Sequence, residues 1–140
     1  MAQVYRTDLL EEALKEVCDK LDGVQGAVIV SIEGFVVAAY APHEEDDLDD
    51  EESPTSSPQV AAMAATLIAL GERTLARLAQ GEMMRLLIEG NDGGMLVVPA
   101  TKRASIAAMV NREAKMGLVL YALQQSTKKI SEILEGGIPG

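Results

Sequence analysis

The chain has 140 residues, with 22 acidic and 12 basic side chains and a formal charge of −10. We expect a single domain over residues 1–140, because the 48% hydrophobic content is too high for a disordered chain. The acidity disfavours a nucleic-acid binder, and the 3% aromatic content leaves no platform for stacked bases. Much of the charge is local, since residues 44–52 hold eight acids in nine positions.

The number of cysteines and the N-terminal residues indicate the cellular compartment. Cys18 is the only cysteine, so no internal disulfide can form. The first residues become charged at once and lack the apolar core of a signal peptide. No stretch is as strongly apolar as a membrane-spanning helix of about 20 residues requires. We therefore expect a cytoplasmic protein without membrane insertion.

The first 40 residues predict a helix followed by a hairpin. Residues 8–21 carry apolar side chains at the spacing of one helix face, and Thr7 is a candidate N-cap. Residues 27–32 and 35–40 are rich in β-branched and apolar side chains. Two residues, Glu33-Gly34, separate them, which is typical of a tight hairpin turn.

The middle of the chain predicts a loop and a long helix. Residues 41–57 combine two prolines with the acidic run, so we expect a disordered loop that acts as a spacer. Ser57 and Pro58 suit the N-cap and first position of a helix that runs to about Gln80, before Gly81. This helix is unusually rich in alanine.

The remaining residues predict three strands and a final helix. The strands cover 83–89, 94–98 and 105–110. Asn111 is a candidate cap for a helix that runs to residue 134, with a short flexible tail at 135–140. The order α-β-β-α-β-β-β-α predicts an α/β (α+β) domain with a five-stranded, mostly antiparallel sheet. Because the strands are apolar on both faces, we expect helices on both sides, in three α/β/α layers.

We find no catalytic, cofactor or metal motif, and predict that the protein is not an enzyme. His43 is isolated in the acidic loop, and Cys18 lies on an apolar helix face, as a small buried hydrophobe does. The acidic run lacks the ligand pattern of a calcium loop. The glycines at 90, 93 and 94 join two strands and do not enter a helix, as a phosphate-binding loop would.

The small-sided helix at 58–80 is the most informative element. Its alanines permit close packing on its own sheet, and they equally permit a symmetric helix–helix contact in a dimer. For the second interpretation, the outward stripe is formed by small and apolar residues: Ala61, Ala65, Ile68, Ala69, Leu75 and Ala76.

The sequence resembles the roadblock/dynein-light-chain family, and its bacterial members in particular. The similarity spans roughly residues 7–134 and depends on the order and spacing of several short segments. They are Leu21–Val28, Ser31–Ala38, Ala61–Leu70, Gly71-Glu72, Gly81-Glu82, Leu87–Gly90 and Met116–Val119.

The resemblance implies a homodimer in which the 58–80 helix pairs with its twin and the third strand extends the sheet across the two-fold axis. Met84 and Leu86 of that strand complete the predicted interface. It also implies a partner, since family members commonly bind small Ras-like GTPases or serve as scaffold subunits.

We therefore predict a regulator or scaffold that binds a small Ras-like GTPase and modulates its nucleotide state. Two alternatives stay open: a structural adaptor of a larger complex, and a small-molecule sensor of the PAS or GAF type. The scarcity of aromatic residues disfavours the sensor, whose pocket they usually line.

Overall fold

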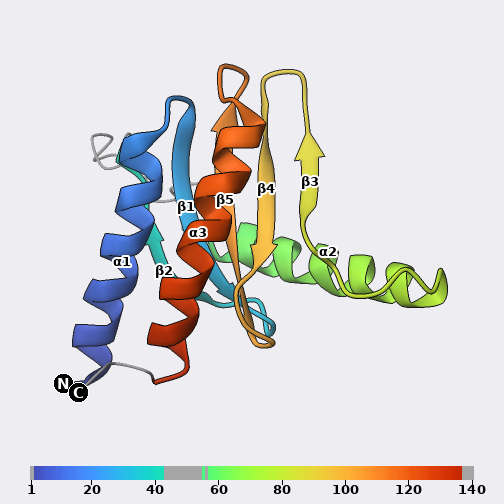
Figure 1. The fold of residues 1–140 in the computed structure, drawn as a ribbon, viewed down its shortest axis with the longest axis horizontal. Coiled ribbons are helices and arrows are strands. Elements are labelled where there is room, and N and C mark those ends of the chain that lie inside the picture. Colours follow the sequence, from blue (N-terminus) through green and yellow to red (C-terminus); the bar gives the residue numbers. More distant parts are fainter. Residues whose placement is uncertain (1, 43–54, 56, 137–140) are drawn as a thin grey trace.

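The computed structural model describes residues 2–42, 55 and 57–136, so His43, the acidic run 44–52 and most of the predicted tail lie outside the described residues. The predicted order of elements is confirmed (Figure 1). The elements are α1 (Ala2–Lys20), β1 (Val24–Ser31), β2 (Val36–Tyr40), α2 (Pro58–Arg77), β3 (Leu86–Glu89), β4 (Gly93–Pro99), β5 (Ala104–Asn111) and α3 (Met116–Leu134).

The five strands form one sheet in the order β2-β1-β5-β4-β3. Every neighbouring pair is antiparallel, as predicted. The central strands β1 and β5 are apolar on both faces, and almost all of their side chains are buried. Such strands need cover on both sides. The edges are β2 and β3.

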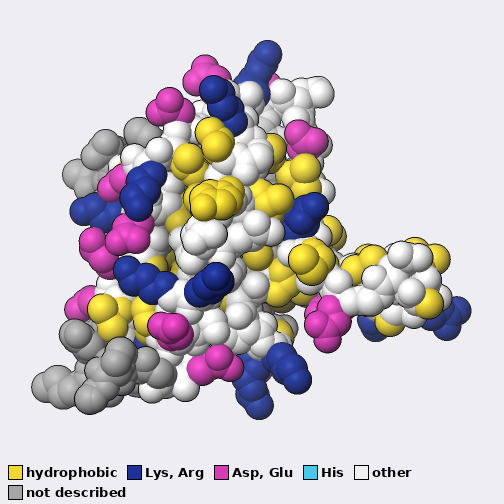
Figure 2. All heavy atoms as spheres, viewed as in Figure 1, with side chains coloured by type: hydrophobic (Ala, Val, Ile, Leu, Met, Phe, Trp, Pro, Cys, Tyr) yellow, Lys and Arg dark blue, Asp and Glu magenta, His cyan; other side chains and the backbone are white. Residues whose placement is uncertain are grey.

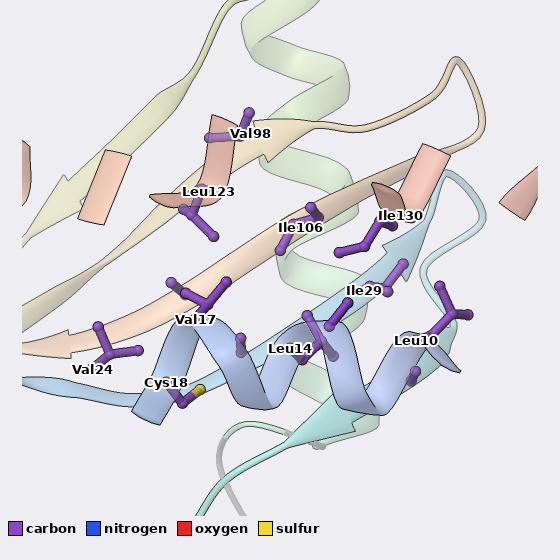
Figure 3. Close-up of a cluster of buried hydrophobic side chains, with 14 of the residues drawn as sticks. Leu10, Leu14, Val17, Cys18, Val24, Ile29, Val98, Ile106, Leu123 and Ile130 are labelled. Carbon is purple, nitrogen blue, oxygen red and sulfur yellow. The ribbon is translucent and has the colours of Figure 1, made fainter. Parts of the chain in front are cut away.

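The helices form the two outer layers of the predicted three-layer arrangement. Helices α1 and α3 cover one face of the sheet, and α2 crosses the other face alone (Figure 1). The larger core lies between the sheet and the α1/α3 layer (Figure 3). Its largest fully buried side chains are Leu10, Leu14, Ile29, Ile106, Leu123 and Ile130. A smaller cluster beneath α2 comprises Val28, Val30, Ala61, Val97 and Ala107.

Two predicted helix starts are wrong. Helix α1 begins at Ala2, and Thr7 lies inside it, because residues 2–6 contain no helix breaker. Helix α3 begins at Met116, and its N-cap is Lys115. Asn111 ends β5 instead, and its Oδ1 accepts a hydrogen bond from the backbone N–H of Glu113 at 2.9 Å. A side chain suited to capping thus forms a local turn at the end of a strand.

Helix α2 ends at Arg77, earlier than predicted, in a Schellman motif. The N–H of Gln80 donates to the carbonyl of Leu75 at 2.9 Å, and the N–H of Ala79 donates to the carbonyl of Ala76 at 3.1 Å. Ala79 has a positive φ of 55°, the conformation that glycine usually supplies at this position. The chain therefore ends this helix with a strained residue, two positions before the glycine.

The β1–β2 turn is longer than the predicted two residues. The strands end at Ser31 and resume at Val36. The Ser31 carbonyl accepts from the N–H of Gly34 at 2.9 Å, and its hydroxyl accepts from the N–H of Phe35 at 3.1 Å. Ile32 and Phe35, predicted as strand residues, consequently lie in the turn and face solvent.

Part of the predicted 41–57 loop is packed against the sheet. Thr55 and Ser57 are both buried. A Cβ built on Gly26 would collide with the side chain of Thr55, so Thr55 lies directly over the β1 backbone. The chain that enters α2 is therefore fixed at Thr55.

Cys18 is part of the larger core, as its apolar helix face predicted (Figure 3). Burial of the thiol, with a smaller effect of Asp19, raises its pKa from 9.0 to about 12. The thiolate is the reactive form, so burial and the raised pKa both suppress reactivity.

We predict that replacing Ala79 with glycine stabilises the protein, whereas Ala62→Gly in the interior of α2 destabilises it. Removing the left-handed strain at residue 79 is expected to raise the free energy of unfolding by about 1 kcal/mol. Glycine at exposed position 62 is expected to lower it by about 1 kcal/mol. Urea unfolding at one protein concentration measures both changes. Equal effects of the two substitutions would contradict the strain at Ala79.

We predict that Cys18 reacts with Ellman's reagent at pH 8 only after the protein is unfolded. The folded-state pKa is raised, so the contribution of the protonated thiol to stability is complete below pH 9 and is lost as pH rises towards about 12. The urea midpoint of the wild type should fall across this range more than that of Cys18→Ala. Rapid labelling of the folded protein would show that the thiol is accessible.

Candidate protein-interaction surface

Among residues 2–42, 55 and 57–136, no group of three His, Cys, Asp or Glu side chains lies close enough to hold a metal ion. Within the same residues, no helix is long and apolar enough to cross a membrane. The chemistry that the described surface does offer is a set of exposed, large apolar side chains. Most of them lie on or beside α2 and β3.

Helix α2 starts as the sequence predicts. The hydroxyl of Ser57 accepts a hydrogen bond from the N–H of Val60 at 3.3 Å, and Pro58 occupies the first turn. Ala61 and Ala64 are buried, and Ala61 belongs to the cluster between α2 and the sheet. Their small side chains let the helix backbone lie close to the strands. The C-terminal half of the helix then projects beyond β3, past the edge of the sheet (Figure 1).

The projecting half of α2 exposes an apolar residue among basic ones. Leu70 is 53% exposed and lies at a shallow surface depression of about 500 Å³. Arg73 and Arg77 line the same depression, together with Thr74 and Ala76. Neither arginine forms an ion pair with a carboxylate of the described residues. This end of the helix thus presents a mixed surface, with an exposed leucine beside two arginines that form no ion pair with the described carboxylates.

The connection from α2 to β3 is held against the helix. Met83 is buried, and a Cβ built on Gly71 would lie 3.3 Å from its sulfur, so the two are in contact. The predicted strand at 83–89 therefore starts late, at Leu86, because Met83 packs on the helix instead of the sheet. The next residue, Met84, is 69% exposed.

Strand β3 is an unprotected sheet edge. It pairs with β4 through Leu86–Val97, and its other side has no strand partner within the described chain. Its apolar side chains Leu87 and Ile88 are exposed, one towards each face of the sheet. Edge strands in monomeric proteins usually carry charges or prolines that prevent pairing with another chain. In β3 only Glu89 has this character.

The structure divides the eight predicted interface residues into two groups. Ala61 is 2% exposed and belongs to the smaller core cluster, so its predicted place on an outward stripe is wrong. Ala65, Ile68 and Leu86 are partly buried and pack against the same cluster, and Leu75 is partly buried. Close packing of α2 on its own sheet therefore accounts for half of the list. The accessible members are Ala69, Ala76 and Met84.

The predicted stripe of small residues leaves out five large, exposed apolar side chains on or beside α2 and β3: Met63, Leu70, Leu78, Leu87 and Ile88. The sequence does contain a pattern that indicates two of these residues. Met63 and Leu70 are seven residues apart, so they share one helix face. Figure 2 shows hydrophobic side chains on the projecting end of α2 and over α3. On α3, Leu118 and Tyr121 line a groove of about 330 Å³ beside α1.

Comparisons with known proteins agree with this fold. An uncharacterised protein of Methanocaldococcus jannaschii, MJ1340, is 25% identical over 122 residues, covering 87% of this chain and 96% of its own. The gliding protein MglB of Thermus thermophilus is 18% identical, with a TM-score of 0.79 over 94% of this chain and 92% of its own. MglB solved in a tetrameric arrangement is also 18% identical, with a TM-score of 0.80 over 95% and 93%.

The family comparison covers most of the fold and all of the candidate interaction surface on α2 and β3, but not α3. The model of the Roadblock/LC7 domain matches residues 9–110, from α1 through β5. This range includes α2 and β3, with their exposed apolar side chains. The chain belongs to the Roadblock/LC7 family.

Proposed function

We propose that this protein is a non-enzymatic homodimer that binds a small Ras-like GTPase and modulates its nucleotide state. The observation that carries the proposal is the coincidence of two unpaired features at one end of the molecule. The half of α2 that projects beyond the sheet exposes Leu70 next to small and basic side chains, and the β3 edge next to it is open (Figure 1).

A dimer with its two-fold axis beside β3 would cover the projecting half of α2 and pair the open edge of β3. The two β3 edges would pair as one continuous sheet, which provides partners for their free backbone groups. Each projecting α2 would then lie over the sheet of the other protomer, where Met95 and Met109 are only partly buried. Such an interface is isologous, so one surface serves both protomers. The similarity to MglB in a tetrameric arrangement supports self-association.

The GTPase partner is supported by the resemblance to bacterial roadblock regulators and by the structural similarity to MglB. A protein without catalytic groups changes a nucleotide state by binding one conformation of the GTPase more tightly than another. A tenfold difference in affinity corresponds to about 1.4 kcal/mol. We propose that the dimer acts through such a difference.

A structural adaptor is the second candidate. Exposed apolar side chains occur on both faces of the sheet, at Leu70 on α2 and at Leu118 and Tyr121 on α3. Two separate surfaces would let one protein bridge two partners. In this case binding to a GTPase would not depend on its nucleotide.

We predict that Ala69→Glu and Met84→Glu each convert the dimer to monomers. Both positions are exposed in the single chain, so a carboxylate there leaves the fold intact but places a charge in the proposed interface. Light scattering measures the molar mass. Leu118→Glu, on the opposite face, is the control and should remain dimeric. A dimeric mass for both test variants would exclude this interface.

We predict that at least one GTPase binds with nucleotide-dependent affinity. Each small Ras-like GTPase of the source organism is purified, loaded with GDP or GTPγS, and titrated against the protein by biolayer interferometry. The expected result is at least a tenfold difference in Kd between the two forms. Equal affinities would favour the adaptor, and no binding to any of them would overturn the proposed function.

A further inference from the structure

A second exposed patch lies beside α2, at the end of the sheet where two turns meet. The β1–β2 turn contributes Ile32 and Phe35, and the β4–β5 turn contributes Lys102 and Arg103. We call these four residues the turn patch. The two turns lie side by side (Figure 1), and the N–H of Ile32 donates to the carbonyl of Arg103 at 2.9 Å.

The backbone of the turn patch is fixed by hydrogen bonds and packing. Ser31 holds the first turn through both its carbonyl and its hydroxyl. Gly34 rests on α2, where an added Cβ would lie 3.1 Å from the Cα of Ala62. In the second turn, the N–H of Arg103 donates to the hydroxyl of Thr101 at 3.0 Å. A fixed backbone reduces the conformational entropy that is lost on binding.

The side chains of the turn patch are suited to contact another protein. Phe35, the only phenylalanine in the chain, is 70% exposed, and Ile32 is 57% exposed. Neither contributes to the described cores. Lys102 and Arg103 are exposed and pair with no carboxylate of the described residues, while Glu33 is the one acid in the first turn. Aromatic and arginine side chains are enriched at the centres of protein interfaces.

The turn patch continues onto α2. A small cleft of about 40 Å³ separates the first turn from the helix, and Ile32, Ala65, Ala69 and Glu72 are among its lining residues. The small side chains of α2 leave space here for a partner to approach Ile32. Ile32 and Phe35 lie away from the proposed dimer axis, because the β1–β2 turn is three strand positions from β3, or about 14 Å. Ala69 borders both this cleft and the proposed dimer interface.

We infer that the turn patch is a docking site for the partner GTPase, through a GTPase surface that has an apolar pocket bordered by carboxylates. This inference rests on the proposed function. The apolar pocket would accept Phe35 and Ile32, and the carboxylates would pair with Lys102 and Arg103. An anionic membrane is a poorer fit, because Glu33 lies between the two apolar residues and the whole chain carries a charge of −10.

The test uses the full chain and the GTPase that binds the wild type most tightly. Ile32→Ser with Phe35→Ser removes the apolar half, and Lys102→Ser with Arg103→Ser removes the basic half. We expect each double variant to weaken binding at least tenfold in biolayer interferometry. The basic variant should also flatten the dependence of Kd on salt concentration. Leu118→Ser with Tyr121→Ser, on the opposite face, is the matched control and should bind like the wild type.

The substituted side chains are exposed, and the hydrogen bond between the turns uses only backbone atoms, so both variants should keep the circular dichroism spectrum and mass of the wild type. If both fold and bind like the wild type, the docking site is wrong while the proposed function stands. If no GTPase binds the wild type, both fail. Wild-type binding to vesicles of phosphatidylcholine and phosphatidylserine, lost in both variants, would assign the turn patch to a membrane.

Discussion

The structure depends on one constraint: the central strand pair β1–β5 is apolar on both faces and must be covered on both. One face receives two helices and builds the larger core around Leu14, Ile29 and Leu123. The other face receives only α2, which buries the smaller cluster around Val28 and Val97. A single helix cannot cover five strands. The unequal cover leaves Met95, Met109 and Ile88 partly exposed beside α2, and the proposed dimer would complete the second layer.

Much of this architecture could be predicted from the sequence, because apolar periodicity and turn residues specify the elements and their order. The antiparallel sheet follows from two short connections, and the cap at Ser57 from its position before Pro58. The element boundaries that could not be predicted depend on which of several nearby groups forms a hydrogen bond with a given side chain. Asn111 forms a turn with Glu113 instead of capping a helix, and Ser31 binds Phe35 within a turn that the sequence suggested was shorter.

The candidate surface was harder to predict for a different reason. A run of alanines shows that a helix can approach another surface closely, but it does not show which surface. Ala61 is buried by the protein's own sheet, whereas Ala69, two turns later, lies farther round the helix beside the β1–β2 turn and is exposed. That distinction depends on the crossing angle of α2 and on where β3 ends, which are tertiary properties. The exposed Phe35 likewise could not be separated from a strand residue before the turn length was known.

The contact between Met83 and Gly71 has a consequence for the rate at which two such molecules could associate. A helix end that extends beyond its sheet would ordinarily fray. Two molecules that collide could then bind only after this end of the helix had folded. Here the returning chain lies along the projecting helix (Figure 1) and a buried methionine attaches it. The projecting half of α2 is thereby supported from its own side before any second chain arrives. Two molecules that collide in the right orientation could bind without further folding. Diffusion and orientation, instead of local folding, would then limit the association rate.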